Sequence, residues 1–268
     1  MKSPVGPAMR AEIESALTAI EQEDGVRILF AVESGSRAWG FHSPDSDYDV
    51  RFVYARPRDW FYKLGKKRDV IERPIDDELD LSGWELSKAL ELALGSNAVI
   101  AEWLQSPIQY RAQPGVIDQL TTFTEQALSR KSVTWHYLSL MRRQKSRVRD
   151  PEGRLRVKRW FYILRPALAL RWLRLNTSAM PPMDLARLRA GAGLDKSTED
   201  AIDALLVRKM AAKEKATMEG VDLLLEELVD SEWRAAEDWV SEAPRDDIRA
   251  LWEEASRLHL ELSETAFR

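Results

Sequence analysis

Asp47 and Asp49, separated by one residue, are the side chains whose types and spacing point most directly to chemistry. They begin the segment DYDVRFVYA (residues 47–55), whose β-branched and aromatic residues predict a strand. Because side chains alternate between the faces of a strand, both carboxylates point the same way, roughly 6–7 Å apart at their Cα atoms. This spacing suits two oxygen-seeking cations about 3.5–4 Å apart.

Composition narrows the choice of metal. The chain has no Cys, which excludes disulfides, thiolate metal sites and cysteine nucleophiles. Its three histidines, His42, His136 and His259, argue against a histidine-built zinc site. Carboxylate ligands therefore favour Mg²⁺, or Mn²⁺, over zinc.

A third carboxylate is needed if one cation is to activate an attacking hydroxyl group. The segment ELDLS (residues 78–82) predicts a strand in which Asp80 is flanked by two leucines that anchor the backbone. We prefer Asp80 to Glu78, Asp76 and Asp77 for this reason. Asp80 would bind the second cation and accept the proton of the incoming hydroxyl group.

An anion site is predicted just before this pair of aspartates. The strand expected over residues 26–35 ends at Gly35 and is followed by Ser36, and the backbone without a Cβ atom at Gly35 allows the close approach of a phosphate. The hydroxyl group of Ser36 and the guanidinium of Arg37 could both contact phosphate oxygens.

A second set of candidate nucleotide ligands lies on a predicted helix over residues 155–175. Lys158, Tyr162 and Arg165 recur there at helical spacing on one face. They could grip a phosphate and stack on a base in a cleft between domains. The alternative is that Tyr162 belongs to the core and that the cations face solvent.

The elements that must position these residues predict an α+β fold. Strands are expected over 26–35, 47–55, 69–73 and 78–82, the last two as a hairpin, after a helix over 10–22 that ends at Gly25. Helical periodicity dominates afterwards, over residues 84–94, 97–105, 115–147, 155–175, 184–190, 197–215, 218–240 and 245–264. We place the boundary between an α+β domain and a helical domain near residue 110.

The net charge of −4 conceals two opposite segments. Residues 141–175 hold twelve Lys or Arg against two acids, whereas residues 222–264 hold fourteen acids against four Arg. The two segments either face each other or water, or the basic one forms a wall beside an anion site and binds RNA. Ten Trp are expected mostly in the core, with Trp39 the one beside the predicted chemistry.

Membrane and secretory classes are not expected. No stretch approaches the roughly 18 consecutive apolar residues of a spanning helix, and the first residues lack the apolar region of a secretory signal. We therefore expect a cytoplasmic protein without a membrane partner. The oligomeric state and the base of the nucleotide stay open.

These motifs resemble those of a known family. Gly35-Ser36, then Asp47-x-Asp49, then a carboxylate on a later strand, is similar to the DNA polymerase β-like nucleotidyltransferase superfamily. More narrowly, the chain looks like the predicted nucleotidyltransferases of the RNA-ligase-associated (RlaP/YcgL-like) group. This resemblance rests on the blocks ESGSRAWGFHSPDSDYDVRFVY, ELDLSGWELSKAL, SNAVIAEWLQSPIQY and VKRWFYILRPALALRWL.

The resemblance implies a small mixed-sheet palm domain and an all-helical domain. With the boundary that we place near residue 110, these are residues 1–110 and 111–268. It implies metal-dependent transfer of an NMP from an NTP, with the triphosphate on Gly35 and Ser36 and the metals on Asp47, Asp49 and Asp80. It does not supply the acceptor. We expect a nucleic-acid end, such as RNA or tRNA, and the alternatives are a protein or small molecule, or a non-catalytic regulator that binds an NTP.

Overall fold

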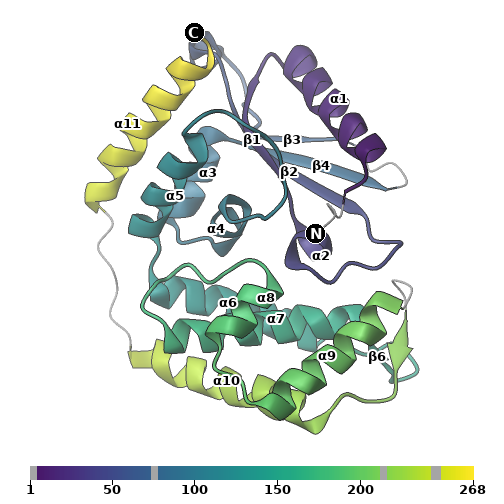
Figure 1. Cartoon of the computed structure of the whole chain (residues 1–268). Coiled ribbons are helices and arrows are strands. Elements are labelled where there is room, and N and C mark those ends of the chain that lie inside the picture. Colours follow the sequence, from purple (N-terminus) through teal and green to yellow (C-terminus); the bar gives the residue numbers. More distant parts are fainter. Residues whose placement is uncertain (1–4, 74–77, 212–215, 243–248) are drawn as a thin grey trace. The chain divides into compact units, whose positions relative to one another are not determined.

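The computed structural model describes residues 5–73, 78–211, 216–242 and 249–268. Its helices and strands form an α+β fold, as predicted (Figure 1). By its contacts the chain divides into two compact units. Unit 1 consists of Met1–Ala38, Asp47–Ala127 and Asp247–Arg268, and unit 2 of Trp39–Ser46 and Leu128–Asp246.

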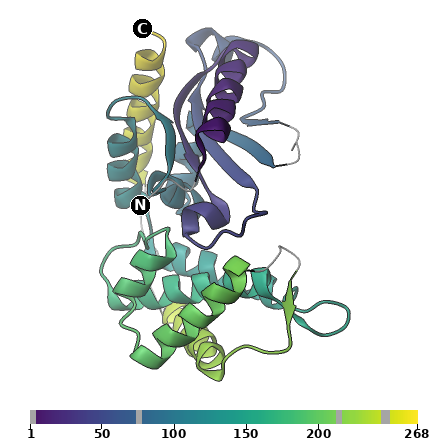
Figure 2. The same ribbon diagram turned by 45° about the vertical axis from the view of Figure 1, so that its right-hand side comes forward.

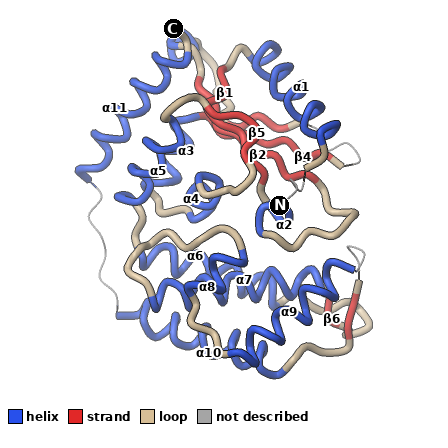
Figure 3. Tube along the Cα trace, in the orientation of Figure 1, coloured by secondary structure: helices blue, strands red, loops and turns tan. Residues whose placement is uncertain are grey.

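Unit 1 is built on a mixed sheet of five strands in the order β3-β4-β2-β1-β5. The strands are drawn in red in Figure 3. These strands are β1 (Arg27–Glu33), β2 (Tyr48–Ala55), β3 (Val70–Glu72), β4 (Leu79–Glu85) and β5 (Gln109–Ala112). The central pair β2 and β4 is parallel, and the other neighbours are antiparallel. The predicted β3–β4 hairpin is thereby confirmed, although its connection, with Asp76 and Asp77, lies outside the described residues.

Helices cover both faces of this sheet (Figures 1 and 2). Helix α1 (Pro7–Asp24) buries Ile13, Leu17 and Ile20 against one face and ends at Gly25, as the sequence predicts. The other face carries α3 (Leu86–Leu94), α4 (Ala98–Leu104), α5 (Val116–Ala127) and α11 (Arg249–Ala266). The 3₁₀ helix η1 (Arg58–Tyr62) follows β2, and the short α2 (Gly35–Trp39) follows β1.

Unit 2 is helical apart from a two-stranded ribbon of β6 (Leu155–Arg156) and β7 (Thr217–Met218). Its helices are α6 (Arg130–Lys145), α7 (Val157–Leu175), α8 (Leu185–Gly191), α9 (Lys196–Ala211) and α10 (Leu223–Glu242). Helix α7 contacts α6, α8 and α10, continues through Pro166 and buries many of its side chains in the core of this unit. Among the described helices, none is both long and apolar enough to cross a membrane.

The structure differs from the sequence prediction at several boundaries. The helix expected over 155–175 begins at Val157, after β6, and the helix expected over 218–240 begins at Leu223, after β7. The helix expected over 115–147 is two helices, because Ser129 caps α6 with its hydroxyl oxygen. The helix expected from residue 84 begins at Leu86, after β4. Residues 109–112, expected beside a domain boundary, form the edge strand β5 of the sheet. Unit 1 therefore extends to Ala127 rather than to residue 110. Helix α11 also packs in unit 1.

The parallel pairing of β2 and β4 requires a residue without a side chain at Gly83. A Cβ atom there would lie 2.1 Å from Cε2 of Phe52, which is fully buried and cannot move aside. We expect Gly83→Ala to lower the free energy of unfolding by about 1–3 kcal/mol. Urea unfolding followed by circular dichroism measures this change. Gly220→Ala is the matched control, since a Cβ atom at Gly220 has no neighbour within 4 Å, and equal stability of the two variants would contradict the prediction.

Candidate active site

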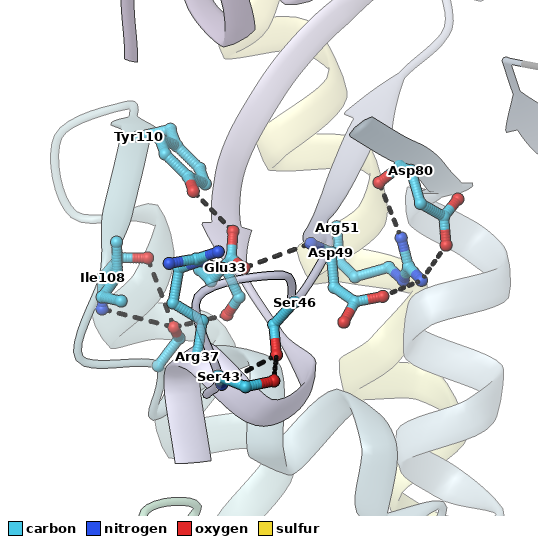
Figure 4. Close-up of polar contacts among 10 residues, drawn as sticks. Glu33, Arg37, Ser43, Ser46, Asp49, Arg51, Asp80, Ile108 and Tyr110 are labelled. Atoms are coloured by element: carbon cyan, nitrogen blue, oxygen red, sulfur yellow. Dashed lines mark hydrogen bonds and ion pairs between the residues drawn. The ribbon is translucent and has the colours of Figure 1, made fainter. Parts of the chain in front are cut away.

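Two carboxylates lie side by side on the central parallel strands of unit 1. Asp49 of β2 is the register partner of Asp80 of β4. The guanidinium of Arg51 lies between them, with Nη2 3.2 Å from Asp49 Oδ1 and 2.6 Å from Asp80 Oδ2 (Figure 4). All three side chains are partly accessible to solvent, at 31% for Asp49, 27% for Asp80 and 18% for Arg51. A compact, charge-compensated site therefore forms where β2 and β4 begin.

Asp47 has a different environment from Asp49. It is exposed and directly precedes β2, which begins at Tyr48, so it lies one residue outside the strand to which we assigned it. Among the residues that the structure describes, no three His, Cys, Asp or Glu side chains form a group that could hold a metal ion. The structure thus joins Asp49 to Asp80, and a place for Asp47 in the same ligand set stays a prediction.

Gly35 adjoins this pair of carboxylates. Its φ angle is +60°, and a Cβ atom there would lie 1.9 Å from Asp49 Oδ2. The backbone can approach Asp49 this closely only because residue 35 is glycine. Ser36 follows as a buried residue of α2. The predicted Gly-Ser segment and Asp49 are therefore neighbours in space.

A buried glutamate organises the same end of β1. Glu33 Oε1 accepts a hydrogen bond from the backbone N–H of Asp49 at 3.1 Å, and Oε2 accepts one from the hydroxyl group of Tyr110 at 2.5 Å (Figure 4). Its backbone carbonyl accepts a third from Ser106 Oγ at 2.6 Å. Burial raises the pKa of Glu33 to about 7, although both hydrogen bonds and Arg37 act to lower it. Burial and the neighbouring Glu33 also raise the pKa of Tyr110.

Arg37 is part of this buried network. Its Nε atom lies 3.6 Å from Glu33 Oε1, and its guanidinium carbon lies 3.8 Å from the centre of the Tyr48 ring. Only 6% of the residue is exposed. In this structure Arg37 compensates the charge of Glu33, and its predicted contact with phosphate stays a prediction.

Three features of unit 1 fit a hard divalent cation. Asp49 and Asp80 offer oxygen donors from adjacent strands, which is the ligand type that Mg²⁺ and Mn²⁺ prefer. The backbone beside them is left bare at Gly35, where a side chain would fill the space at Asp49. Arg51 provides positive charge between the two carboxylates, as a cation would.

The candidate ligands of unit 2 separate into two environments. Lys158 and Tyr162 line a groove of about 700 Å³, together with Asp150, Arg154, Arg156, Arg159 and Thr217. Within it, Arg154 pairs with Asp150 at 2.9 Å, and Arg159 donates to Gln144 at 3.0 Å. The groove therefore presents several cations and one half-buried aromatic ring.

Arg165 is not on this groove. It is 2% exposed, donates from Nε to the carbonyl of Met183 at 3.0 Å, and lies 4.5 Å over the ring of Trp39. The segment Trp39–Ser46 belongs to unit 2, where Phe41 stacks on Phe161 at 4.7 Å. Arg165 is thus a packing residue of the unit 2 core, and the half-buried ring of Trp39 lies against it.

The basic and acidic segments meet within unit 2. Lys145 pairs with Asp230 at 2.6 Å, and Arg171 and Arg174 both contact the buried carboxylate of Glu232, at 2.9 and 2.7 Å. Internal pairing therefore accounts for part of the predicted basic segment 141–175. The cations of the groove are a separate part of that segment.

Three residues of the site were missed by the sequence prediction. Arg51 follows Asp49 by two residues, so alternation along the strand could have placed it on the same face. Glu33 is an acid at the end of an otherwise apolar strand, which is a weaker signal. Nothing local indicates Tyr110, which meets Glu33 from 77 residues away.

Comparison with known proteins assigns the chain to a family. The RlaP family, described as an RNA repair pathway DNA polymerase beta family, matches residues 9–261. The chain belongs to this family. The uncharacterized protein YcgL of Bacillus subtilis (strain 168) is 41% identical over 201 residues, which cover 75% of this chain and 76% of YcgL. Membership of RlaP confirms the predicted resemblance and supports a nucleotidyl transfer function.

A solved structure was also found. It is a nucleotidyltransferase-like protein from Exiguobacterium sibiricum 255-15, with a TM-score of 0.29 and 12% identity. The match covers 87% of this chain and 74% of that protein. The RlaP assignment rests instead on the family match and on YcgL.

The raised pKa of Glu33 predicts a pH-dependent stability. Below pH 4.5 Glu33 is protonated in both folded and unfolded chains, whereas above pH 7 the folded chain must hold a buried charge. Its contribution to the free energy of unfolding should therefore fall by about 3 kcal/mol as pH rises from 4.5 through 7. We expect Glu33→Gln to remove this decline, as measured by urea unfolding in metal-free buffer, while the exposed control Glu72→Gln retains it. An identical pH dependence in Glu33→Gln and the wild type would refute the prediction.

Proposed function

We propose that this protein transfers an NMP from an NTP to an acceptor hydroxyl group, with Mg²⁺ or Mn²⁺ as cofactor. The observation that carries the proposal is the pairing of Asp49 with Asp80 on parallel strands directly beside Gly35. Membership of a polymerase β family supports the same reaction class. Asp47, Asp49 and Asp80 would hold the metal, and Gly35 and Ser36 the triphosphate.

Arg51 has a defined part in this proposal. Two carboxylates held on adjacent strands repel each other, and the guanidinium between them offsets this repulsion before substrate binds. If Asp49 and Asp80 held a divalent cation, Arg51 would release at least one of these carboxylates and could pair with a phosphate oxygen instead. Arg51 thereby keeps the carboxylates in place between turnovers.

Phosphoryl transfer mainly requires positioning and charge neutralisation. When bound, Mg²⁺ supplies positive charge at the transferred phosphate and at the departing pyrophosphate, and it favours deprotonation of the attacking hydroxyl group. Asp80 accepts the proton of that hydroxyl group. Glu33 accepts a hydrogen bond from the backbone N–H of Asp49. This bond fixes the position of the Asp49 main chain, from which the carboxylate side chain extends.

RNA is the acceptor that the chain favours. The groove of unit 2 combines Arg154, Arg156, Lys158 and Arg159 with the ring of Tyr162. Cations that follow a phosphate backbone and an aromatic ring on which a base stacks are the usual components of single-strand binding. The family description, which refers to an RNA repair pathway, agrees with this choice.

Asp49→Asn tests the reaction. We expect at least about a 100-fold loss of Mg²⁺-dependent pyrophosphate release, with NTP binding only weakened, because the carboxylate supplies charge that an amide lacks. The assay uses each α-labelled NTP with Mg²⁺ or Mn²⁺ and separate pools of RNA, protein and small molecules. Asp59→Asn is the matched control, since Asp59 is 71% exposed on η1.

The pool that becomes labelled identifies the acceptor. Label on RNA supports the proposal, whereas label only on protein or small molecules would overturn the choice of RNA. Tight NTP binding without label in any pool would make the protein a non-catalytic regulator. Undiminished turnover in Asp49→Asn would contradict the assignment of Asp49 to the active site.

Charge reversal in the groove tests the RNA interaction independently of turnover. We expect Arg156→Glu with Lys158→Glu to weaken binding of a single-stranded RNA by at least about tenfold, and to lower the slope of log affinity against log salt by about 2. Fluorescence anisotropy over a salt series measures both quantities. Lys196→Glu on α9 with Arg234→Glu on α10 makes the same change in net charge elsewhere in unit 2, since both side chains are exposed and lie outside the groove lining. An equal loss in the two pairs would mean that net charge alone attracts RNA.

A further inference from the structure

Unit 1 contains a second cavity that the proposed reaction does not use. It has a volume of about 460 Å³ and is lined by residues of η1 and of the C-terminal part of the chain, including the last turns of α11. Small-molecule sites typically occupy about 300–1,000 Å³ and have mostly apolar walls with a few polar groups. The walls here are formed by Phe61, Tyr62, Leu260 and Phe267. Three aromatic rings in such a small space favour a flat aromatic ligand.

Polar atoms without hydrogen bonds lie in the same cavity. His259 and Ser263, one helical turn apart on α11, both line it. His259 Nε2 and Ser263 Oγ are buried and have no hydrogen-bond partner among the residues that the structure describes. His259 Nε2 also lies 3.6 Å from Oε1 of Glu85, a residue outside the cavity lining. Because buried polar atoms are rarely left unsatisfied, these atoms point to a polar group that enters the cavity.

Cations surround the aromatic wall. Arg58 and Arg268 line the cavity, and the guanidinium of Arg27 lies 5.8 Å from the centre of the Phe267 ring. The carboxylate of Glu264 is 4.0 Å from Arg58, whose side chain remains 77% exposed. These guanidinium groups can pair with an anion at the edge of the cavity.

We propose that this cavity binds a nucleoside monophosphate. The base packs against Phe61, Tyr62 and Phe267, its polar edge bonds to Ser263 and His259, and the phosphate pairs with Arg58 or Arg268. Inorganic phosphate would leave the aromatic wall unused, and a purely apolar ligand would leave the polar atoms and the cations unused. The proposal does not depend on nucleotidyl transfer, since it concerns binding outside the Asp49 and Asp80 site.

Titration of the full chain with AMP, GMP, CMP and UMP in EDTA, by calorimetry and ligand-observed NMR, tests the proposal. We expect at least one monophosphate to bind, and its nucleoside to bind at least about tenfold more weakly for lack of the charged group. Tyr62→Ala and Ser263→Leu should each weaken binding by about tenfold or more, the first by removing a stacking surface and the second by filling the cavity. Tyr62 is 74% exposed, so its substitution leaves the core intact.

Two controls make the outcome decisive. Leu64→Ala removes a fully exposed side chain close to Tyr62 in sequence and outside the cavity lining, and Asp80→Asn alters the carboxylate site. We expect both to leave monophosphate affinity unchanged. A loss in Asp80→Asn without one in Tyr62→Ala would locate binding at the carboxylates and overturn the proposal. The absence of binding, or equal affinity for nucleoside and monophosphate, would overturn it too, whatever the result of the turnover assay.

Discussion

The parallel pairing of β2 and β4 is the constraint on which the candidate active site depends. It places Asp49 opposite Asp80, although 30 residues of chain separate them. A shift by one residue would turn one of the two carboxylates to the other face of the sheet. The ring of Phe52 packs against Gly83, its register partner, which has no side chain. The packing of the two strands therefore decides the positions of Asp49 and Asp80 at their start.

Charge compensation is the second theme of this unit. Glu33, Asp49 and Asp80 gather around the ends of three adjacent strands, and each has an arginine within 3.6 Å. Arg37 and Tyr110 contact the buried carboxylate of Glu33. Arg51 instead contacts the accessible carboxylates of Asp49 and Asp80. The division separates a fixed structural acid from two carboxylates that remain partly open to solvent and hence to a substrate.

Unit 2 divides its cations in a similar way. Glu232 is 2% exposed and contacts Arg171 and Arg174, which join α10 to α7. Arg165 is buried under Trp39 and bonded to the backbone, whereas Lys158 and Tyr162 line an open groove on the same helix. One helix thus supplies the core with one set of side chains and a candidate RNA surface with another.

The sequence by itself determined the α+β class, helix α1 with its end at Gly25, the β3–β4 hairpin and the family, since these depend on local periodicity and on short motifs. It also brought Gly35, Asp49 and Asp80 forward as candidates. Only the tertiary structure decided that Arg51 lies between the carboxylates, that Tyr110 meets Glu33 and that Arg165 is buried. Those outcomes depend on strand register and on which helix face is covered, and both are set by contacts between residues far apart in the chain.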